Sequence, residues 1–407
     1  MKHFVIGALA IGALLGSTAL GALAEDKVVL SMWHNHPEWK DRVEAILQKF
    51  EEQNPTIDVQ LEEIAGPNYQ ARVNTALAAG EAPDLFMLSP GPDTAAAAKA
   101  GYIVDLTDKL DISGLTDAAK NASTIDGKVW SVPVLGSYTV GLYYHRKIFE
   151  ENGLTPPSTM EEFHQVCKTL QDKGITPMIA PAQDGVIPAF LYMMLSSSIL
   201  GADGFDKIRT GEKKFTDADV LPAAVALRDM YPCFQEGSLG TPYVEGKALF
   251  ALGQGAMLEG GSADFAGFQE TNPNIDVGVV PFPAVAGGKP STVTGMEGAY
   301  AVNAKSKHPE DATKFLQFML GKDAAQMVVD TITLTTTKGV LPSNNRVMSE
   351  MLKAAESRDV RVFYEFPETG GVFAAIQQNA ASLFLGELSP EDFSAKLQAA
   401  VIPSGAM

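Results

Sequence analysis

Strand-like and helix-like segments alternate along the N-terminal part of the chain, and this order strongly limits the folds available to it. Three strands are predicted from β-branched or alternating apolar residues, over residues 28–33, 56–64 and 84–88. Two helices are predicted between them from apolar side chains three and four positions apart, over residues 39–54 and 69–79. Strands that alternate with helices in this way form a parallel βαβ sheet, so the predicted fold class is α/β.

The same mixture of segments continues after Pro133 and indicates a second α/β body. Further strands are predicted over residues 137–144, 277–283 and 298–303, and helices over 158–170, 190–200 and 219–231. The chain has 407 residues, of which 46% are hydrophobic, so it exceeds the length that one hydrophobic core usually serves. We therefore expect two domains.

The first 24 residues have the pattern of a secretory signal peptide. Lys2 is followed by an apolar run from Phe4 to Leu15 and then by small residues that end at Ala24. The run is too short for a membrane span, which needs about 20 apolar residues. We expect cleavage after Ala24 and export of the remaining chain. Because no cysteine lies near this point, we expect no lipid anchor and predict a Gram-negative periplasm as the location.

Charge and cysteine content exclude some classes of partner. The formal net charge of −18 argues against nucleic acid, whose phosphates require a basic surface. The two cysteines, Cys167 and Cys233, match no metal-binding spacing. In an oxidising compartment they can form a disulfide; alternatively, they are two small buried apolar residues.

Polar and aromatic residues follow each of the three N-terminal strands. They are His34, Asn35, His36 and Glu38 after the first strand, Gly66, Pro67, Asn68 and Tyr69 after the second, and Ser89, Pro90, Gly91 and Asp93 after the third. Loops at the carboxyl ends of parallel strands meet at one edge of the sheet, where such sheets bind ligands. These residue types suit a carbohydrate, because hydroxyls need donors and acceptors and C–H faces need rings. Taken singly, each residue is equally explained as ordinary loop polarity.

A series of short motifs runs in a fixed order along the exported chain. They are SMWHNHPEW (31–39), GEAPDLFML (80–88), AGYIVDLTDKL (100–110), DGKVWSVPV (126–134), GLYYHRKIFEENGLTPPSTMEEF (141–163), GQGAMLEGGS (253–262), VGVVPFP (277–283) and HPEDATKFLQFML (308–320). Each motif is weak alone, but their order is specific. In this order the chain resembles the extracellular solute-binding proteins, family 1, of ABC importers, in the sugar-binding branch that is similar to maltose-binding protein.

The resemblance implies a periplasmic-binding-protein fold of type II, in which two α/β lobes joined by a three-segment hinge close over a ligand. The implied crossings between the lobes lie near residues 133–137, 280–284 and 331–341. The implied N-terminal lobe comprises residues 25–134 and 284–331, and the C-terminal lobe residues 135–283 and 332–407.

The function implied by the resemblance is transport. The protein would bind a mono- or oligosaccharide, or a glycoside, by hinge closure and deliver it to the permease subunits of an ABC transporter in the inner membrane. No catalysis, cofactor or metal is implied, and we expect a monomer.

The resemblance also places ligand contacts in particular loops. In the N-terminal lobe they are His34, Asn35, Glu38, Trp39, Tyr69 and Asp93. In the C-terminal lobe and the hinge they are Ser137, Tyr138, Gln183, Asp184, Gly261, Ser262, Met296, Glu297 and Tyr364. Ala263 stands where relatives commonly have tryptophan, and residues 185–187 lack an aromatic that is also common. Fewer stacking rings favour a smaller or more polar ligand than a long oligosaccharide.

Two alternative functions remain open. The same fold also carries non-sugar solutes such as glycerol phosphate or polyamines: an anion would need arginine, which the loops above lack, whereas a cation would need convergent carboxylates. A secreted glycoside hydrolase would need two carboxylates about 5–10 Å apart across the scissile bond. The chain has no G-x-S-x-G or H-E-x-x-H motif, so a receptor is the favoured interpretation.

Overall fold

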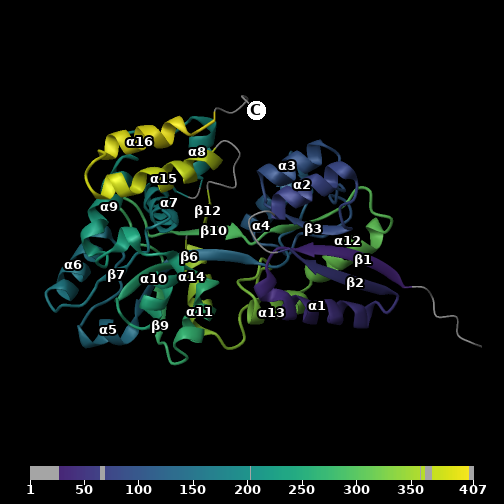
Figure 1. Ribbon diagram of the computed structural model, residues 1–407, viewed down its shortest axis with the longest axis horizontal. Coiled ribbons are helices and arrows are strands. Elements are labelled where there is room, and N and C mark those ends of the chain that lie inside the picture. The colour runs from purple at the N-terminus through teal and green to yellow at the C-terminus, as the bar shows by residue number, and fades with distance from the viewer. Residues whose placement is uncertain (1–26, 65–68, 202, 358, 363–368, 403–407) are drawn as a thin grey trace, which may run out of the picture.

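The computed structural model describes residues 27–64, 69–201, 203–357, 359–362 and 369–402. Its elements form two groups that lie side by side (Figure 1). The predicted signal peptide and Tyr364 lie outside the described residues, as does the side chain of Glu38. Each group has its own sheet and its own buried core. The protein is therefore a two-lobed α/β molecule.

The N-terminal lobe is built on a four-stranded sheet in the order β11-β3-β1-β2. Its strands and helices are β1 (Val28–His34), η1 (Pro37–Trp39), α1 (Lys40–Gln53), β2 (Ile57–Glu63), α2 (Tyr69–Ala79), β3 (Leu85–Leu88), α3 (Pro92–Lys99), α4 (Asp117–Ser123), β4 (Thr124–Ile125), β5 (Lys128–Val129), β11 (Ala299–Val302), α12 (Pro309–Met319) and α13 (Lys322–Thr331). Strand β1 pairs in parallel with both β2 and β3, which confirms the predicted βαβ order. Strand β11 returns much later in the sequence and runs antiparallel to β3.

The core of the N-terminal lobe follows from the helix-period pattern of α1. This helix buries Val43, Ile46, Leu47 and Phe50 against the sheet, and the ring of Phe50 meets that of Phe315 in α12 edge-on at 5.2 Å. Burial of apolar side chains on one face is what stabilises a surface helix on a sheet. The predicted sequence pattern thus placed α1 correctly, and its packing fixes the loop that precedes it.

The C-terminal lobe contains a larger mixed sheet in the order β12-β10-β6-β8-β7, with β9 also pairing with β6. Its elements are β6 (Ser137–His145), α5 (Arg146–Glu151), α6 (Met160–Gln171), β7 (Met178–Ile179), α7 (Val186–Leu200), α8 (Gly204–Thr210), α9 (Pro222–Met230), η2 (Tyr231–Cys233), η3 (Ser238–Gly240), α10 (Tyr243–Ala251), β8 (Met257–Gly261), α11 (Asp264–Thr271), β9 (Val277–Val280), β10 (Thr292–Met296), α14 (Arg346–Ser357), β12 (Asp359–Arg361), α15 (Gly370–Phe384) and α16 (Pro390–Ala399).

Helices cover both faces of the C-terminal sheet. Leu142 of β6 packs into a core with α6, α7, α9, α15 and α16, whereas its neighbour Tyr143 packs into a core with α10, α11 and α14. Successive strand residues point to opposite faces, so one strand serves both cores. Among the described residues no single helix is long and apolar enough to cross a membrane; α7 and α8 pass that test only as a pair bent by 91°.

Local signals fix several boundaries in this lobe. Helix α6 begins at a capping box, in which the Thr159 hydroxyl accepts from the Glu162 backbone N–H and the Glu162 carboxylate accepts from the Thr159 N–H. Cys167 of α6 and Cys233 of η2 form a disulfide, with their Cα atoms 5.7 Å apart. Of the two alternatives for the cysteines, the disulfide is therefore the one the structure shows.

The chain crosses between the lobes three times. In the first crossing the Ser137 N–H donates to Leu334 O of the third, and the Glu297 N–H of the second donates to Gly136 O. Gly136 has φ +115°, and a Cβ there would lie 2.5 Å from Leu334 O, so only glycine fits between the segments.

The second crossing lies later in the chain than the sequence suggested. Strand β10 pairs with β6 over Thr294 to Met296 and belongs to the C-terminal sheet, whereas β11, from Ala299, belongs to the N-terminal sheet. The chain therefore crosses between Met296 and Ala299 and not near residues 280–284. The prolines of VGVVPFP end β9 but do not mark the crossing, because β10 follows in the same sheet.

Candidate ligand-binding site

A cavity of about 320 Å³ lies where β1, β3 and β10 end, and we call it the front cavity. The residues that line it are Asn35, Tyr69, Gln70, Leu88, Ser89, Pro90, Pro92, Asp93, Met296, Glu297 and Gly298. Five of the predicted contacts are thus brought together: Asn35, Tyr69, Asp93, Met296 and Glu297. The arrangement follows from topology, since β1 and β3 run parallel and end at the same edge.

Two residues of the front cavity present different kinds of surface. The Tyr69 hydroxyl accepts from the Met87 N–H at 2.9 Å and donates to Trp33 O at 3.3 Å, so its ring is fixed as a wall. Burial raises the pKa of Tyr69, and this phenol stays neutral. By contrast, the side-chain oxygen of Asn35 is buried and has no hydrogen-bond partner among the described residues. An acceptor of this kind is costly unless a ligand hydroxyl or water bonds to it.

Asp93 and Glu297 supply carboxylates to the same cavity. Burial raises the pKa of Asp93, and a hydrogen bond with Ser89 partly offsets this. Glu297 is held at the second crossing, where its carbonyl oxygen accepts from His36 Nε2 at 3.2 Å. The His36 ring in turn stacks on Trp39, with ring centres 4.1 Å apart. The loop after β1 therefore ties the cavity to the hinge.

Three of the predicted contacts are buried and do not line the front cavity. His34 is fully buried, and its Nδ1 lies 2.8 Å from the Tyr300 hydroxyl. Trp39 is 5% exposed and belongs to the core of the N-terminal lobe. Ser262 is 2% exposed, and its hydroxyl accepts from the Thr139 N–H. His34 and Ser262 are thus bonded to residues remote in sequence, and Trp39 stacks on His36.

Ser137 and Met296 line a second space, a cavity of about 560 Å³ that we call the hinge cavity. It also includes Thr139, Thr294 and Leu334, which stand beside them on one face of the crossing segments. Tyr138 points to the opposite face, since neighbouring strand residues alternate. Its ring packs edge-on against Phe190, and its hydroxyl is buried without a partner among the described residues.

The remaining C-terminal contacts lie at the ends of β7 and β8. Gln183 and Asp184 are exposed, and the Asp184 carboxylate accepts from the Val186 N–H at the start of α7. The Gly261 N–H donates to Asp264 Oδ2 at 2.8 Å, and its carbonyl accepts from the Tyr143 hydroxyl. None of these three lines the front cavity.

Sequence reasoning missed some residues that shape the site. Gln70 lines the front cavity one position after Tyr69, and His36 bonds to the hinge although it was not assigned a contact. Glu259, which lines neither the front nor the hinge cavity, was also missed: it is 2% exposed in β8, and one carboxyl oxygen has no partner among the described residues. A lone acid within the apolar run of a strand was the available signal.

Comparisons with known proteins agree with this architecture. Residues 35–326 match the family model for bacterial extracellular solute-binding protein. The multiple sugar-binding protein of Streptococcus mutans is 26% identical over 81% of this chain and 80% of its own length. The melibiose/raffinose/stachyose-binding protein of Bacillus subtilis is 24% identical over 88% of this chain and 85% of its own. The apo form of RafE from Streptococcus pneumoniae superimposes with a TM-score of 0.79 at 23% identity, over 92% of this chain and 97% of that one.

The family model spans well over half of the chain, and the two-lobed fold with its crossing segments is the architecture of the structural relative. The chain belongs to the bacterial extracellular solute-binding protein family.

Proposed function

We propose that the front cavity is the N-terminal half of a binding site for a mono- or oligosaccharide, which the C-terminal lobe completes by hinge closure. The observation that carries this proposal is the donor and acceptor set of the cavity. Asn35, Asp93 and Glu297 offer acceptors for hydroxyl groups, and Tyr69 offers a ring edge or face. Relatives named for multiple sugars and for melibiose, raffinose and stachyose support the same class of ligand.

The transport role completes the proposal. Exported as a solute-binding protein of this family, the chain would act as a monomer in the periplasm after cleavage behind Ala24. It would release its sugar to the permease subunits of an ABC transporter and would catalyse no reaction. Lobe closure is a rigid-body rotation that a ligand drives through contacts made better in the closed state. The lobes comprise approximately the residues that the sequence assigned, with residues 284–296 transferred to the C-terminal lobe.

A polyamine is the second candidate ligand, and one observation favours it. Two carboxylates, Asp93 and Glu297, line the front cavity, and no arginine or lysine is among the described residues that line it. The same composition disfavours glycerol phosphate or another anion, which would need a cationic partner.

Calorimetric titration with melibiose, raffinose and stachyose tests the proposal, with spermidine and glycerol 3-phosphate as competing classes. We expect saturable binding of at least one saccharide and none of the other two compounds. The Glu297→Ala protein should bind the same saccharide about 1–3 kcal/mol more weakly, because a charge-assisted hydrogen bond is lost. Binding of spermidine alone would replace the sugar assignment. Chromatography of the saccharide after incubation checks for cleavage, and any turnover would contradict a purely receptor function.

A further inference from the structure

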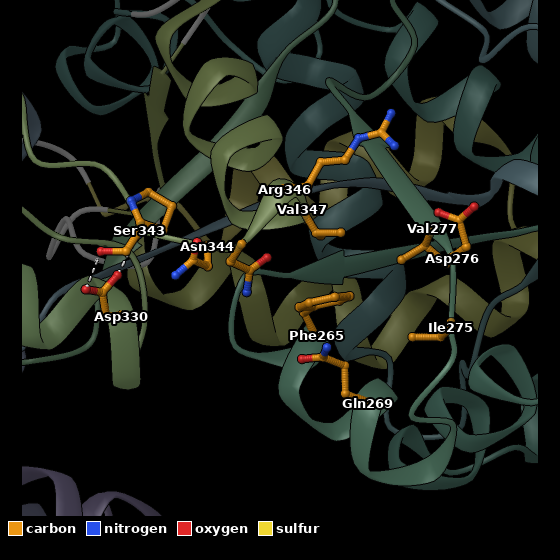
Figure 2. Close-up of a pocket in the computed structure, with 12 residues that line it drawn as sticks. Phe265, Gln269, Ile275, Asp276, Val277, Asp330, Ser343, Asn344, Arg346 and Val347 are labelled. Atoms are coloured by element: carbon orange, nitrogen blue, oxygen red, sulfur yellow. Dashed lines mark hydrogen bonds between the residues drawn. The ribbon is translucent and has the colours of Figure 1, made fainter.

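A third pocket lies on the other side of the hinge from the front cavity, and we call it the back pocket. It measures about 580 Å³ and is lined by residues of α11, the start of β9, the end of α13 and the segment 342–347 (Figure 2). In Figure 1, α2 and α3, which contribute to the front cavity, lie above the crossing strands, whereas α11 and α13 lie below them. The helices that line the two spaces therefore lie on opposite sides of the crossing strands.

One wall of the back pocket is fixed to the N-terminal lobe. The Asp330 carboxylate, at the end of α13, accepts from the Ser343 N–H at 2.7 Å and from the Ser343 hydroxyl at 2.8 Å. The Gln326 amide, one turn earlier in α13, donates to Asp330 and also to Leu341 O at 2.9 Å. These hydrogen bonds clamp residues 341–343 to this helix, and Figure 2 shows the ones between Asp330 and Ser343.

The opposite wall is fixed to the C-terminal lobe. Val347 is buried in the same core as Phe265 of α11 and Val277 of β9. Arg146 pairs with Glu350 of α14 at 2.6 Å and with Asp276 at 3.2 Å. These contacts join α14 to β9 and leave only Asn344 and Asn345 between the segment clamped to one lobe and the segment clamped to the other.

A pocket with walls on two hinged bodies changes shape when they rotate. Because the back pocket and the front cavity lie on opposite sides of the hinge, closure of the front should widen the back. A molecule that fits the widened pocket would bind the closed lobes better than the open ones and would shift the equilibrium toward closure. It would raise the affinity of the front cavity without touching it.

The chemistry of the back pocket selects a neutral molecule. Its charged groups already have partners: Asp330 with Ser343, Asp276 with Arg146, and Arg346 with Glu350 at 3.1 Å. The amides of Gln269 and Asn344 make no hydrogen bond within the described residues, and the Phe265 ring lies beside Gln269 (Figure 2). Amides that can both donate and accept match hydroxyl or amide groups, and unpaired carboxylates or cations are lacking for a charged ligand.

We propose that the back pocket is a regulatory site for a small neutral hydroxyl- or amide-bearing molecule, and that its occupancy favours closure of the lobes. The effect on sugar affinity rests on the proposed function of the front cavity, but the effect on lobe closure does not.

The test fills the pocket covalently. The only two cysteines of the chain are joined to each other, so Gln269→Cys introduces a single free thiol on an exposed position of α11. It is modified with 2-hydroxyethyl, 2-sulfonatoethyl or 2-(trimethylammonio)ethyl methanethiosulfonate, which differ in charge. The control is Glu270→Cys, the next residue of α11, which is exposed and does not line the pocket. Saccharide affinity is measured by calorimetry, and lobe closure by X-ray scattering of the ligand-free protein.

The hydroxyethyl adduct at position 269 should raise saccharide affinity about fivefold or more, the lower range of typical allosteric coupling, and should lower the radius of gyration without sugar. The control adducts should change neither quantity. Unchanged affinity and radius for the hydroxyethyl adduct, or equal changes in the control, would overturn the proposal. Equal effects of the charged adducts would overturn the neutral class. If no saccharide binds the unmodified protein, the radius alone still decides whether filling the pocket closes the lobes.

Discussion

Asp93 is the residue of the front cavity whose protonation bears directly on ligand binding. Burial raises its pKa above the ordinary aspartate value of about 3.9. The ionised carboxylate accepts hydrogen bonds from ligand hydroxyls, and the protonated form loses part of this capacity. Saccharide affinity should therefore be constant near neutral pH and should fall as the pH drops through the raised pKa. Calorimetry between pH 7.5 and pH 4, values chosen to bracket that titration, measures the effect.

The Asp93→Asn protein tests whether the titration of Asp93, and not that of another group, causes the loss of affinity in acid. Its affinity at neutral pH should be lower by about 1–2 kcal/mol, and the acid-induced decline should be reduced. Asp105→Asn is the matched control: the ion pair with Lys128 lowers the pKa of Asp105 to about 2, and it lies outside the front cavity. A pH profile of Asp93→Asn that overlays the unmodified one would remove Asp93 from the site.

A second pH-dependent prediction concerns Glu259 and the stability of the folded protein. Burial raises the pKa of this carboxyl well above its usual range, and repulsion from Asp264 adds to the shift. The folded protein then holds a proton that the unfolded chain releases above about pH 4.3. The contribution of Glu259 to stability is full below that pH and is lost as the pH rises. Glu259→Gln should therefore gain stability relative to the unmodified protein between pH 4.5 and pH 8, as measured by urea unfolding.

The pKa of Asp84 is shifted in the opposite direction, so a variant of this residue serves as the companion to Glu259→Gln. Burial alone would raise its pKa, but hydrogen bonds from Ser306 and from the hydroxyl and N–H of Ser31 lower it overall. Its contribution to stability is present above the unfolded pKa and is lost as the pH falls. Asp84→Asn should destabilise the protein at neutral pH and less so in acid. Parallel pH slopes for the two variants would contradict both assignments.

Site residues could be predicted where the loop position alone decides exposure. Asn35, Tyr69 and Asp93 follow strands that end at one edge, and all three line the front cavity. His34 precedes Asn35 by one residue yet is fully buried, because strand alternation turns it under Tyr300 of β11. That partner is 266 residues away. Burial by remote segments has no local signature, so the sequence could not separate His34 from Asn35.

The disulfide acts at the scale of elements, since it joins α6 to η2 across a sequence separation of 66 residues. Closing a loop of this length restricts the unfolded chain, and removal of such a bond typically costs about 2–4 kcal/mol. The double variant Cys167→Ala/Cys233→Ala should lower the free energy of unfolding by that amount in urea titrations. Saccharide affinity should stay within twofold or so, because neither cysteine lines the front cavity.

Reduction of the unmodified protein provides the control for the disulfide variant. Dithiothreitol should lower its stability toward that of the double variant and should leave the double variant unchanged. A double variant as stable as the oxidised protein would show that the bond adds nothing to the C-terminal lobe.

Element order was largely predictable, because helix and strand periods are local properties of the sequence. The strands over 28–33, 56–64 and 84–88 appear as β1, β2 and β3, and the helix over 39–54 as α1. The sheet to which each strand belongs was harder to predict from the sequence. No local sequence pattern indicates that strand β10 pairs with β6. The prolines before β10 instead suggested that the chain changes lobe there. Pairing between strands about 150 residues apart depends on the assembled core, which local periods do not encode.

At the scale of the whole molecule, hydroxyl groups join the crossings to one another. The Thr336 hydroxyl of the third crossing donates to Pro133 O of the first at 2.8 Å, and next to the crossings the hydroxyls of Thr139 in β6 and Thr294 in β10 lie 2.8 Å apart. These threonines are buried, and buried hydroxyls in proteins are generally hydrogen-bonded. Hydrogen bonds of this kind can exchange partners at low free-energy cost when the lobes rotate. Closely packed apolar side chains at the same place would resist the rotation.

Thr333 of the third crossing bonds to both Ser137 and Ser262, and a prediction for the whole molecule concerns this residue. It is fully buried, its hydroxyl donates to Ser137 O at 3.1 Å, and it lies 3.2 Å from the Ser262 hydroxyl. Thr333→Val keeps the shape and removes these bonds. Unfolding free energy should fall by about 1–3 kcal/mol, and saccharide affinity should also fall, because binding must then order the third crossing.

The control for Thr333→Val is Thr331→Val, two residues earlier. The Thr331 hydroxyl donates to Met327 O within α13 and is exposed, so its loss should change stability by about 0.5 kcal/mol or less. Both proteins are compared by urea unfolding, by calorimetry, and by X-ray scattering with and without sugar. The comparison separates the loss of a hydrogen bond between two crossing segments from the loss of one within a single helix. If both variants behave alike, the buried hydroxyls do not couple the crossings, and control of closure must lie in the backbone bonds from Ser137 to Leu334 and from Glu297 to Gly136.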